Sequence, residues 1–220
     1  MAFRPREHRA TSRTILAASA LALTLAACAS APTQKASADP VYQSRYANED
    51  EVVAGYDLGG LTPSKMRKLT AVGFDRPAAD VFYPLLTRVD LYDDTVVTVT
   101  FDHSRSEHPG SFGVGSVRIC TFTSGKTLYE PLVAFEEGRV YAYTVDEERS
   151  TRGMPVDDVL LFYTFEDTAP GKSLVTVRAH FSPKPRIATP MIEYAFGRSI
   201  DGAFARAAEV FGGRLVDADG

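Results

Sequence analysis

Residues 189–211, TPMIEYAFGRSIDGAFARAAEVF, decide the fold of this chain. Apolar side chains recur in the stretch at steps of three and four residues, which is the period of one face of an α-helix. Thr189 is a candidate N-cap, Pro190 suits the first turn, and Gly212-Gly213 ends the pattern. The stretch predicts a long helix whose apolar face carries Ile192, Phe196, Ile200, Ala203, Phe204, Ala207 and Phe211.

Gly197 and Gly202 lie inside this predicted helix. Each glycine costs a helix roughly 1 kcal/mol relative to alanine, so each needs a reason. Two interpretations remain open: close packing of the helix against a sheet, or room for a ligand between helix and sheet.

Seven strand patterns precede the helix. They cover residues 65–74, 95–102, 113–123, 127–136, 139–145, 158–167 and 173–181. Ser124-Gly125, Glu137-Gly138 and Pro170-Gly171 are turn signals between neighbouring strands, and such short links make the strands antiparallel. Residues 77–86 predict a short helix that Pro84 limits.

The N-terminus has the pattern of a secretory signal. Residues 1–13 are basic, and residues 14–27 form an uncharged run that is shorter than the roughly 20 residues of a membrane span. Leu25-Ala26-Ala27-Cys28 then resembles the bacterial lipobox, in which the cysteine is lipidated and becomes the new N-terminus. The resemblance implies a lipid anchor on Cys28 in a bacterial cell envelope, with the domain facing the periplasm. Ala29, where aspartate would favour the inner membrane, favours the outer membrane.

The segment after Cys28 predicts a tether. Residues 29–40 are small, polar and interrupted by proline, so they cannot bury enough apolar surface to fold. Residues 41–64 carry scattered tyrosines, and they either pack on the domain or stay loose. We therefore divide the chain into a signal peptide at 1–27, a lipidated cysteine and flexible tether at 28–64, and a folded domain at 65–215.

Charge and cysteine content exclude several classes of function. The chain has 220 residues and a formal charge of −4, and because residues 1–27 carry +3, the remainder is acidic and unsuited to nucleic acid. Cys120 is the one cysteine left after Cys28, so we expect a buried, inert thiol. Asp102-His103 and Glu107-His108 lie in a polar loop that predicts solvent exposure rather than a metal site. We expect no cofactor, and the sequence gives no oligomeric state.

The order of elements resembles the START-like (SRPBCC) superfamily, the polyketide cyclase and lipid-transport group with the Bet v 1 helix-grip fold. The resemblance rests on that order and on three motifs: Gly113-x-Gly115-x-x-Arg118, Tyr129-Glu130-Pro131-Leu132, and residues 171–178 followed by Phe181-Ser182-Pro183-Lys184. It implies an α+β domain in which a curved antiparallel sheet wraps around the C-terminal helix. It also implies an apolar cavity between them that holds a small hydrophobic ligand, with lipid as one candidate.

Strand register decides which side chains would line that cavity. If the loop of the 113–136 hairpin is the three residues 124–126, Arg118 and Glu130 share a face as diagonal neighbours. A two-residue loop would put them on opposite faces. The family resemblance favours the first register, whereas apolar patterning alone would turn Val133 and Phe135 inward. The expected ligand-binding set is Arg118, Phe122, Glu130, Leu132, Tyr141, Tyr143, Val175, Val177, Phe196 and Ile200.

An inward pair of Arg118 and Glu130 has three interpretations: a structural ion pair, a polar anchor for a ligand, or an acid–base group. No catalytic constellation is identified, so we favour a binding protein over an enzyme. The favoured hypothesis is an envelope lipoprotein that binds or carries a small hydrophobic ligand. The alternatives are a cyclase- or hydrolase-like enzyme using the same cavity, and an envelope scaffold that binds nothing.

Overall fold

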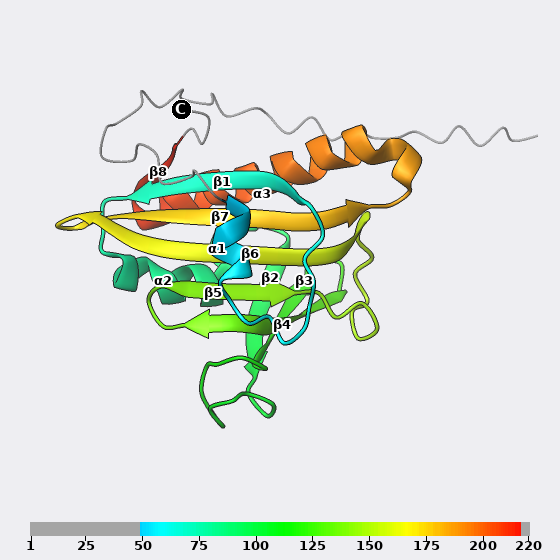
Figure 1. The fold of residues 1–220 in the computed structure, drawn as a ribbon, viewed down its shortest axis with the longest axis horizontal. Helices are drawn as coiled ribbons and strands as arrows, with labels where there is room; N and C mark the ends of the chain where they lie inside the picture. The colour runs from blue at the N-terminus through cyan, green and yellow to red at the C-terminus, as the bar shows by residue number, and fades with distance from the viewer. Residues whose placement is uncertain (1–48, 217–220) are drawn as a thin grey trace, which may run out of the picture. The chain divides into compact units, whose positions relative to one another are not determined.

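A computed structural model describes residues 49–216 (Figure 1). In this part of the chain eight strands form one antiparallel sheet in the order β2-β3-β4-β5-β6-β7-β1-β8. The strands are β1 (Met66–Phe74), β2 (Val96–Asp102), β3 (Val117–Phe122), β4 (Thr127–Glu136), β5 (Val140–Thr144), β6 (Val156–Ala169), β7 (Lys172–Pro183) and β8 (Gly213–Val216). The helices are α1 (Glu49–Ala54), α2 (Ala78–Thr87) and α3 (Thr189–Phe211), with 3-10 turns at Val89–Leu91 and Arg186–Ala188.

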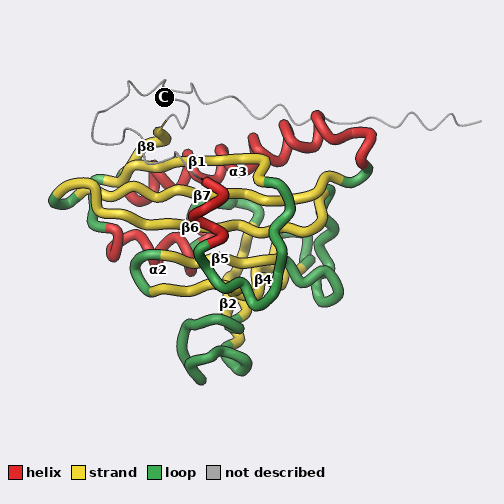
Figure 2. The backbone as a smooth tube through the Cα atoms, viewed as in Figure 1, coloured by secondary structure: helices red, strands yellow, loops and turns green. Residues whose placement is uncertain are grey.

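The predicted helix-grip arrangement is confirmed. The curved sheet packs against the long helix α3 on one face, and Figure 2 shows α1 on the other. We call the face toward α3 the inner face and the opposite one the outer face. The predicted hairpin turns are confirmed as well: Gly125, Gly138 and Gly171 all take the left-handed conformation that glycine tolerates best.

Besides shifts of one or two residues at the ends of elements, the structure differs from the sequence prediction in three places. The strand expected to begin at residue 113 begins at Val117, because Gly115 turns the chain with a φ of 88°. Helix α3 is capped by Ala188 rather than Thr189, whose hydroxyl instead donates to the carbonyl of Arg186. The chain after Gly212 was not predicted to form a strand, yet β8 pairs with the edge of β1.

The main core lies between the inner face, α2 and α3. It includes Phe82 and Leu85 of α2, Tyr163 and Val175 of the sheet, and Phe204 of α3, all nearly inaccessible to solvent. Burial of this apolar surface is the main driving force that holds α3 against the sheet.

Residues 52–64, which we call the strap, cross the outer face. Val53 and Leu58 are buried there against Leu160 and Phe162 in a second hydrophobic cluster. The prediction that the whole of 28–64 is a flexible tether is therefore wrong for the strap, which packs on the domain as the other open interpretation had it. Residues 28–48 lie outside the described residues.

The contacts around the two glycines of α3 test one of their two interpretations, close packing against the sheet. A Cβ on Gly197 would meet the side chain of Lys68 at 3.5 Å, an ordinary contact. A Cβ on Gly202 would meet nothing within 4 Å. Close approach of helix to sheet is thus not what requires glycine at either position.

Candidate functional site

The hairpin of β3 and β4 places Arg118 directly opposite Glu130 on the inner face. Its loop has three residues, as the favoured register requires, but they are Thr123–Gly125 rather than 124–126. The prediction that Arg118 and Glu130 are diagonal neighbours is therefore wrong, because the two residues pair directly. The parity of the strand is unchanged, so both side chains still share one face.

A β-bulge in β4 removes the conflict between the two patterns in the sequence. The pairing of β4 with β5 shifts between Leu132 and Ala134, which adds a residue to one strand. Leu132 consequently faces the inner core and Val133 the outer cluster. Phe135 then packs on the inner core again, so the apolar pattern is right for Phe135 and wrong for Val133.

Arg118 and Glu130 form a buried ion pair. The Nε of Arg118 donates to Oε2 of Glu130 at 2.8 Å, and its Nη1 donates to the carbonyl of Leu86 at 3.2 Å. The guanidinium carbon also lies 4.0 Å from the ring centroid of Tyr143. Burial acts to lower the pKa of Arg118, but the Glu130 carboxylate, together with Tyr143 and Cys120, outweighs burial and the pKa is raised. This cation is held charged inside the domain.

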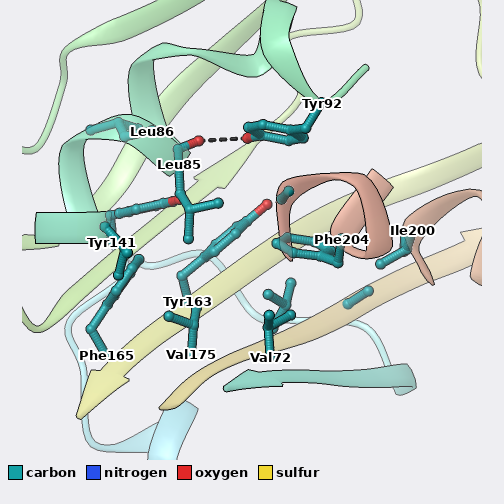
Figure 3. Close-up of a cluster of buried hydrophobic side chains, with 14 of the residues drawn as sticks. Val72, Leu85, Leu86, Tyr92, Tyr141, Tyr163, Phe165, Val175, Ile200 and Phe204 are labelled. Atoms are coloured by element: carbon teal, nitrogen blue, oxygen red, sulfur yellow. Dashed lines mark hydrogen bonds between the residues drawn. The ribbon is translucent and has the colours of Figure 1, made fainter. Parts of the chain in front are cut away.

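Four buried tyrosines lie near the ion pair on the inner side: Tyr92, Tyr141, Tyr143 and Tyr163. Figure 3 shows Tyr92, Tyr141 and Tyr163. The hydroxyls of Tyr143 and Tyr163 share a hydrogen bond of 3.0 Å, and Tyr92 donates to the carbonyl of Leu85. The hydroxyl of Tyr141 is buried and has no hydrogen-bond partner among the described residues. Burial raises the pKa of Tyr143 to about 12 and raises those of the other three well above their ordinary value. All four hydroxyls stay protonated at neutral pH.

The remaining predicted site residues fall into two groups. Leu132, Val175, Val177 and Ile200 belong to the inner core, and the half-buried Phe196 packs on it with its ring 4.8 Å from that of Phe181. Phe122 lies apart, in a smaller cluster with Cys120 and Leu128 and under the guanidinium of Arg152.

Aromatic rings occupy the space between the sheet and the C-terminal half of α3. The ring of Tyr163 lies 5.8 Å from that of Phe204 and 4.4 Å from that of Tyr141, measured between centroids. Tyr92 closes the other side, 6.4 Å from Phe204. Figure 3 shows Tyr163 reaching from the sheet toward Phe204 of α3. Of these four rings only that of Tyr141 belongs to the predicted ligand-binding set, and it stacks on the ring of Tyr163.

A groove of about 740 Å³ lies on the outer face, where the strap meets the start of β1 and the end of β7. Apolar side chains of the strap line it, together with Met66 and the buried His180, whose Nδ1–H donates to the carbonyl of Ser64 at 2.8 Å. The groove was not predicted, because residues 41–64 show no pattern that places them on the domain. The apolar residues Val53 and Leu58 are the signal that could have indicated it.

The other reactive groups considered from the sequence have structural partners. Cys120 is buried as predicted, its Sγ lies 3.4 Å from Oε2 of Glu130, and burial followed by that carboxylate raises its pKa. His103 shares a hydrogen bond with Ser116 at 2.9 Å, and Glu107 accepts from the backbone of Val114. Between residues 49 and 216, no three acidic, histidine or cysteine side chains gather where they could hold a metal ion.

Comparisons with known proteins give structural neighbours only. No protein-family model and no curated protein matches the chain. Among solved structures, the chain is similar to XoxI from Bacillus cereus, at 20% identity and a TM-score of 0.48 over 66% of this chain and 94% of that one. A protein from Thermobifida fusca gives 22% identity and a TM-score of 0.49, over 66% and 92%. Ara h 8.0201 gives 17% and 0.48, over 65% and 94%.

The assignment of the fold rests on the strand order and on α3 of this chain itself. Within the described residues, no helix combines the length and hydropathy that are needed to cross a bilayer.

Proposed function

We propose that this protein is an envelope lipoprotein, anchored through Cys28, whose domain binds a small hydrophobic molecule that carries a hydrogen-bond acceptor. The order of basic stretch, apolar run and Leu-Ala-Ala-Cys supports the anchor. Binding is placed between the inner face and α3, where an apolar interior encloses a polar cluster. Ala29 favours the outer membrane as the site of attachment.

The unpartnered hydroxyl of Tyr141 is the observation that carries the ligand proposal. It is buried inside the core, and a buried donor without a partner costs about 1–3 kcal/mol. A ligand carbonyl or ether oxygen would accept from this hydroxyl, while the apolar part of the ligand would contact Leu132 and Val175. The Arg118–Glu130 pair would orient the acceptor by holding the surrounding tyrosines in place.

The packed rings favour a second candidate, a scaffold whose interior is filled by its own side chains. On this hypothesis Tyr141 is simply a poorly satisfied core residue. A ligand needs Tyr163 or Phe204 to move, because their rings close the space that it would enter. The two candidates therefore differ in what the Tyr141 hydroxyl contributes.

The substitution Tyr141→Phe separates them, since it removes the hydroxyl and keeps the ring. If a ligand accepts from Tyr141, native mass spectrometry of the lipidated protein from its own membrane shows bound small molecules that the variant loses. Their identity follows from extraction into organic solvent. If the interior is a plain core, no ligand is recovered from either protein, and the variant is more stable by about 1 kcal/mol or more.

Glu130→Gln is a weaker test of the same site. It leaves the charge of Arg118 buried and unpaired, which costs about 3–5 kcal/mol of folding free energy whether or not a ligand binds. A loss of bound ligand in Glu130→Gln could therefore come from unfolding as well as from a lost contact with the ligand. Tyr141→Phe leaves the ion pair intact and does not have this ambiguity.

The anchor is tested separately with Cys28→Ser. We expect the wild-type chain to incorporate labelled fatty acid and to sediment with membranes, and the variant to do neither. A chain that remains unlabelled while its Cys28 is intact would contradict the anchor and leave the ligand proposal standing.

A further inference from the structure

One face of the first turns of α3 exposes large apolar side chains. Ile187, in the 3-10 turn that leads into the helix, is 94% exposed, and Met191 and Tyr194 are each 68% exposed. With Arg198 they follow at steps of four, three and four residues, so they share one face of the helix. Figure 1 shows these turns extending beyond the start of β1, where the rest of the domain does not cover them.

The charged side chains on this face are positive and exposed to solvent. Arg186 and Arg198 are exposed and form no ion pair among the described residues, although the Arg198 guanidinium lies 6.0 Å from the ring of Tyr194. Glu193, the acidic residue of these turns, forms an ion pair with Arg67 of β1. A chain that is acidic after residue 27 thus presents an uncompensated basic and apolar face at one end of α3.

We infer that this face, which we define as Arg186, Ile187, Met191, Tyr194 and Arg198, docks onto the surface of an anionic lipid bilayer. An interfacial helix needs apolar side chains that enter the acyl boundary and cations that meet the headgroups. Tyrosine suits the boundary because its ring is apolar and its hydroxyl is polar. A protein partner with an acidic apolar groove, or a second copy of this chain, would meet the same face but would show no dependence on lipid headgroups.

The docking is independent of the lipid proposed at Cys28, so it can be measured without that lipid. The test uses the full chain with Cys28→Ser and Tyr194→Trp. Because the chain contains no tryptophan, residue 194 becomes the sole indole reporter. Vesicles of phosphatidylcholine alone are compared with vesicles of phosphatidylcholine and phosphatidylglycerol in equal parts.

We expect the indole emission to shift to shorter wavelength with the mixed vesicles, much less with phosphatidylcholine alone, and less again in 1 M salt. Replacing both Arg186 and Arg198 by glutamine should weaken binding about 25-fold, at roughly fivefold for each arginine near an anionic surface. Met191→Asp should abolish the shift. Val210→Asp is the matched control, since Val210 is a 46% exposed residue of α3 outside this face, and it should bind like its parent.

Residues 1–27 carry a basic and apolar stretch of their own, so every variant is compared in the same full chain. An equal shift on both vesicle types, or arginine variants that bind like their parent, would overturn docking by headgroup charge. A shift that grows with protein concentration in the absence of vesicles would show instead that a second copy covers the face. Absence of any shift would overturn the inference as well.

Discussion

At the scale of single residues, Gly115 shows why the Gly-x-Gly motif stands before Arg118. A Cβ at Gly115 would lie 2.1 Å from the carbonyl oxygen of Arg105, and the φ of 88° is one that other residues avoid. The glycine lets residues 103–116 fold back on themselves before β3 begins. The motif is thus a requirement of the backbone and does not by itself indicate a ligand.

Gly115→Ala should destabilise the domain by about 3 kcal/mol or more, because backbone strain of about 1–3 kcal/mol is joined by a clash with rigid backbone. Urea unfolding measures the difference. Gly125→Ala is the control: it has a similar positive φ but nothing within 4 Å of the added Cβ, so about 1–2 kcal/mol is expected. Equal losses in the two variants would contradict the role given to the Arg105 carbonyl.

Once the loop length was chosen, the alternation of side chains predicted which residues share a face of the sheet, but not which residues pair. The favoured loop 124–126 and the observed loop 123–125 both put Arg118 and Glu130 on one face, because the shift between them preserves the alternation of side chains. The two-residue loop, which would have separated the pair, was disfavoured only by the family resemblance. The bulge after Leu132 could not be predicted, since no single residue there requires it. That the Tyr141 hydroxyl lacks a hydrogen-bond partner could not be predicted either, because it depends on the positions of the neighbouring hydroxyls.

At the scale of elements, periodicity explains which parts of the fold the sequence could reveal. Helix α3 and the seven longer strands have enough residues to show a period of 3.6 or 2. The six-residue α1 and the four-residue β8 are too short to show one. Beyond the end of α1 at Ala54, the strap has neither period nor regular structure. The outer apolar surface around Phe162 that holds it is present only once the sheet is assembled.

Leu58→Ala tests whether the strap is part of the cooperative fold. Leu58 is 7% exposed in the outer cluster, so truncation should cost about 2–5 kcal/mol of folding free energy. Leu61→Ala, at a strap residue that is 36% exposed, should change stability by no more than about 0.5 kcal/mol. If both variants unfold in urea like the wild-type protein, the strap contributes nothing to stability.

At the scale of the whole domain, the interior combines a large apolar core with one enclosed polar cluster. Replacing a buried ion pair by apolar residues is often neutral or stabilising, so the pair of Arg118 and Glu130 is weak evidence for stability by itself. The interior also buries the hydroxyls of four neighbouring tyrosines: Tyr92, Tyr141, Tyr143 and Tyr163 are all nearly inaccessible to water. The fold therefore depends on these four side chains staying uncharged.

That dependence predicts unfolding at alkaline pH. In the unfolded chain a tyrosine loses its proton near pH 10, whereas burial raises the folded pKa of Tyr143 to about 12 and those of the other three further in the same direction. The folded state then holds more protons, so stability is full below about pH 10 and falls as the pH rises toward the folded values. Each tyrosine contributes about 1.4 kcal/mol per pH unit, or about 5.5 kcal/mol per pH unit for the four.

Urea unfolding between about pH 8 and pH 11 measures this slope, with tyrosinate absorbance as a second readout. Burial also raises the pKa of the Cys120 thiol, which acts in the same direction. Tyr141→Phe is the informative variant, because it removes one titrating hydroxyl that has no hydrogen bond to lose. Its slope should be smaller by about 1.4 kcal/mol per pH unit. An unchanged slope would contradict the assignment of the alkaline loss to the buried tyrosines.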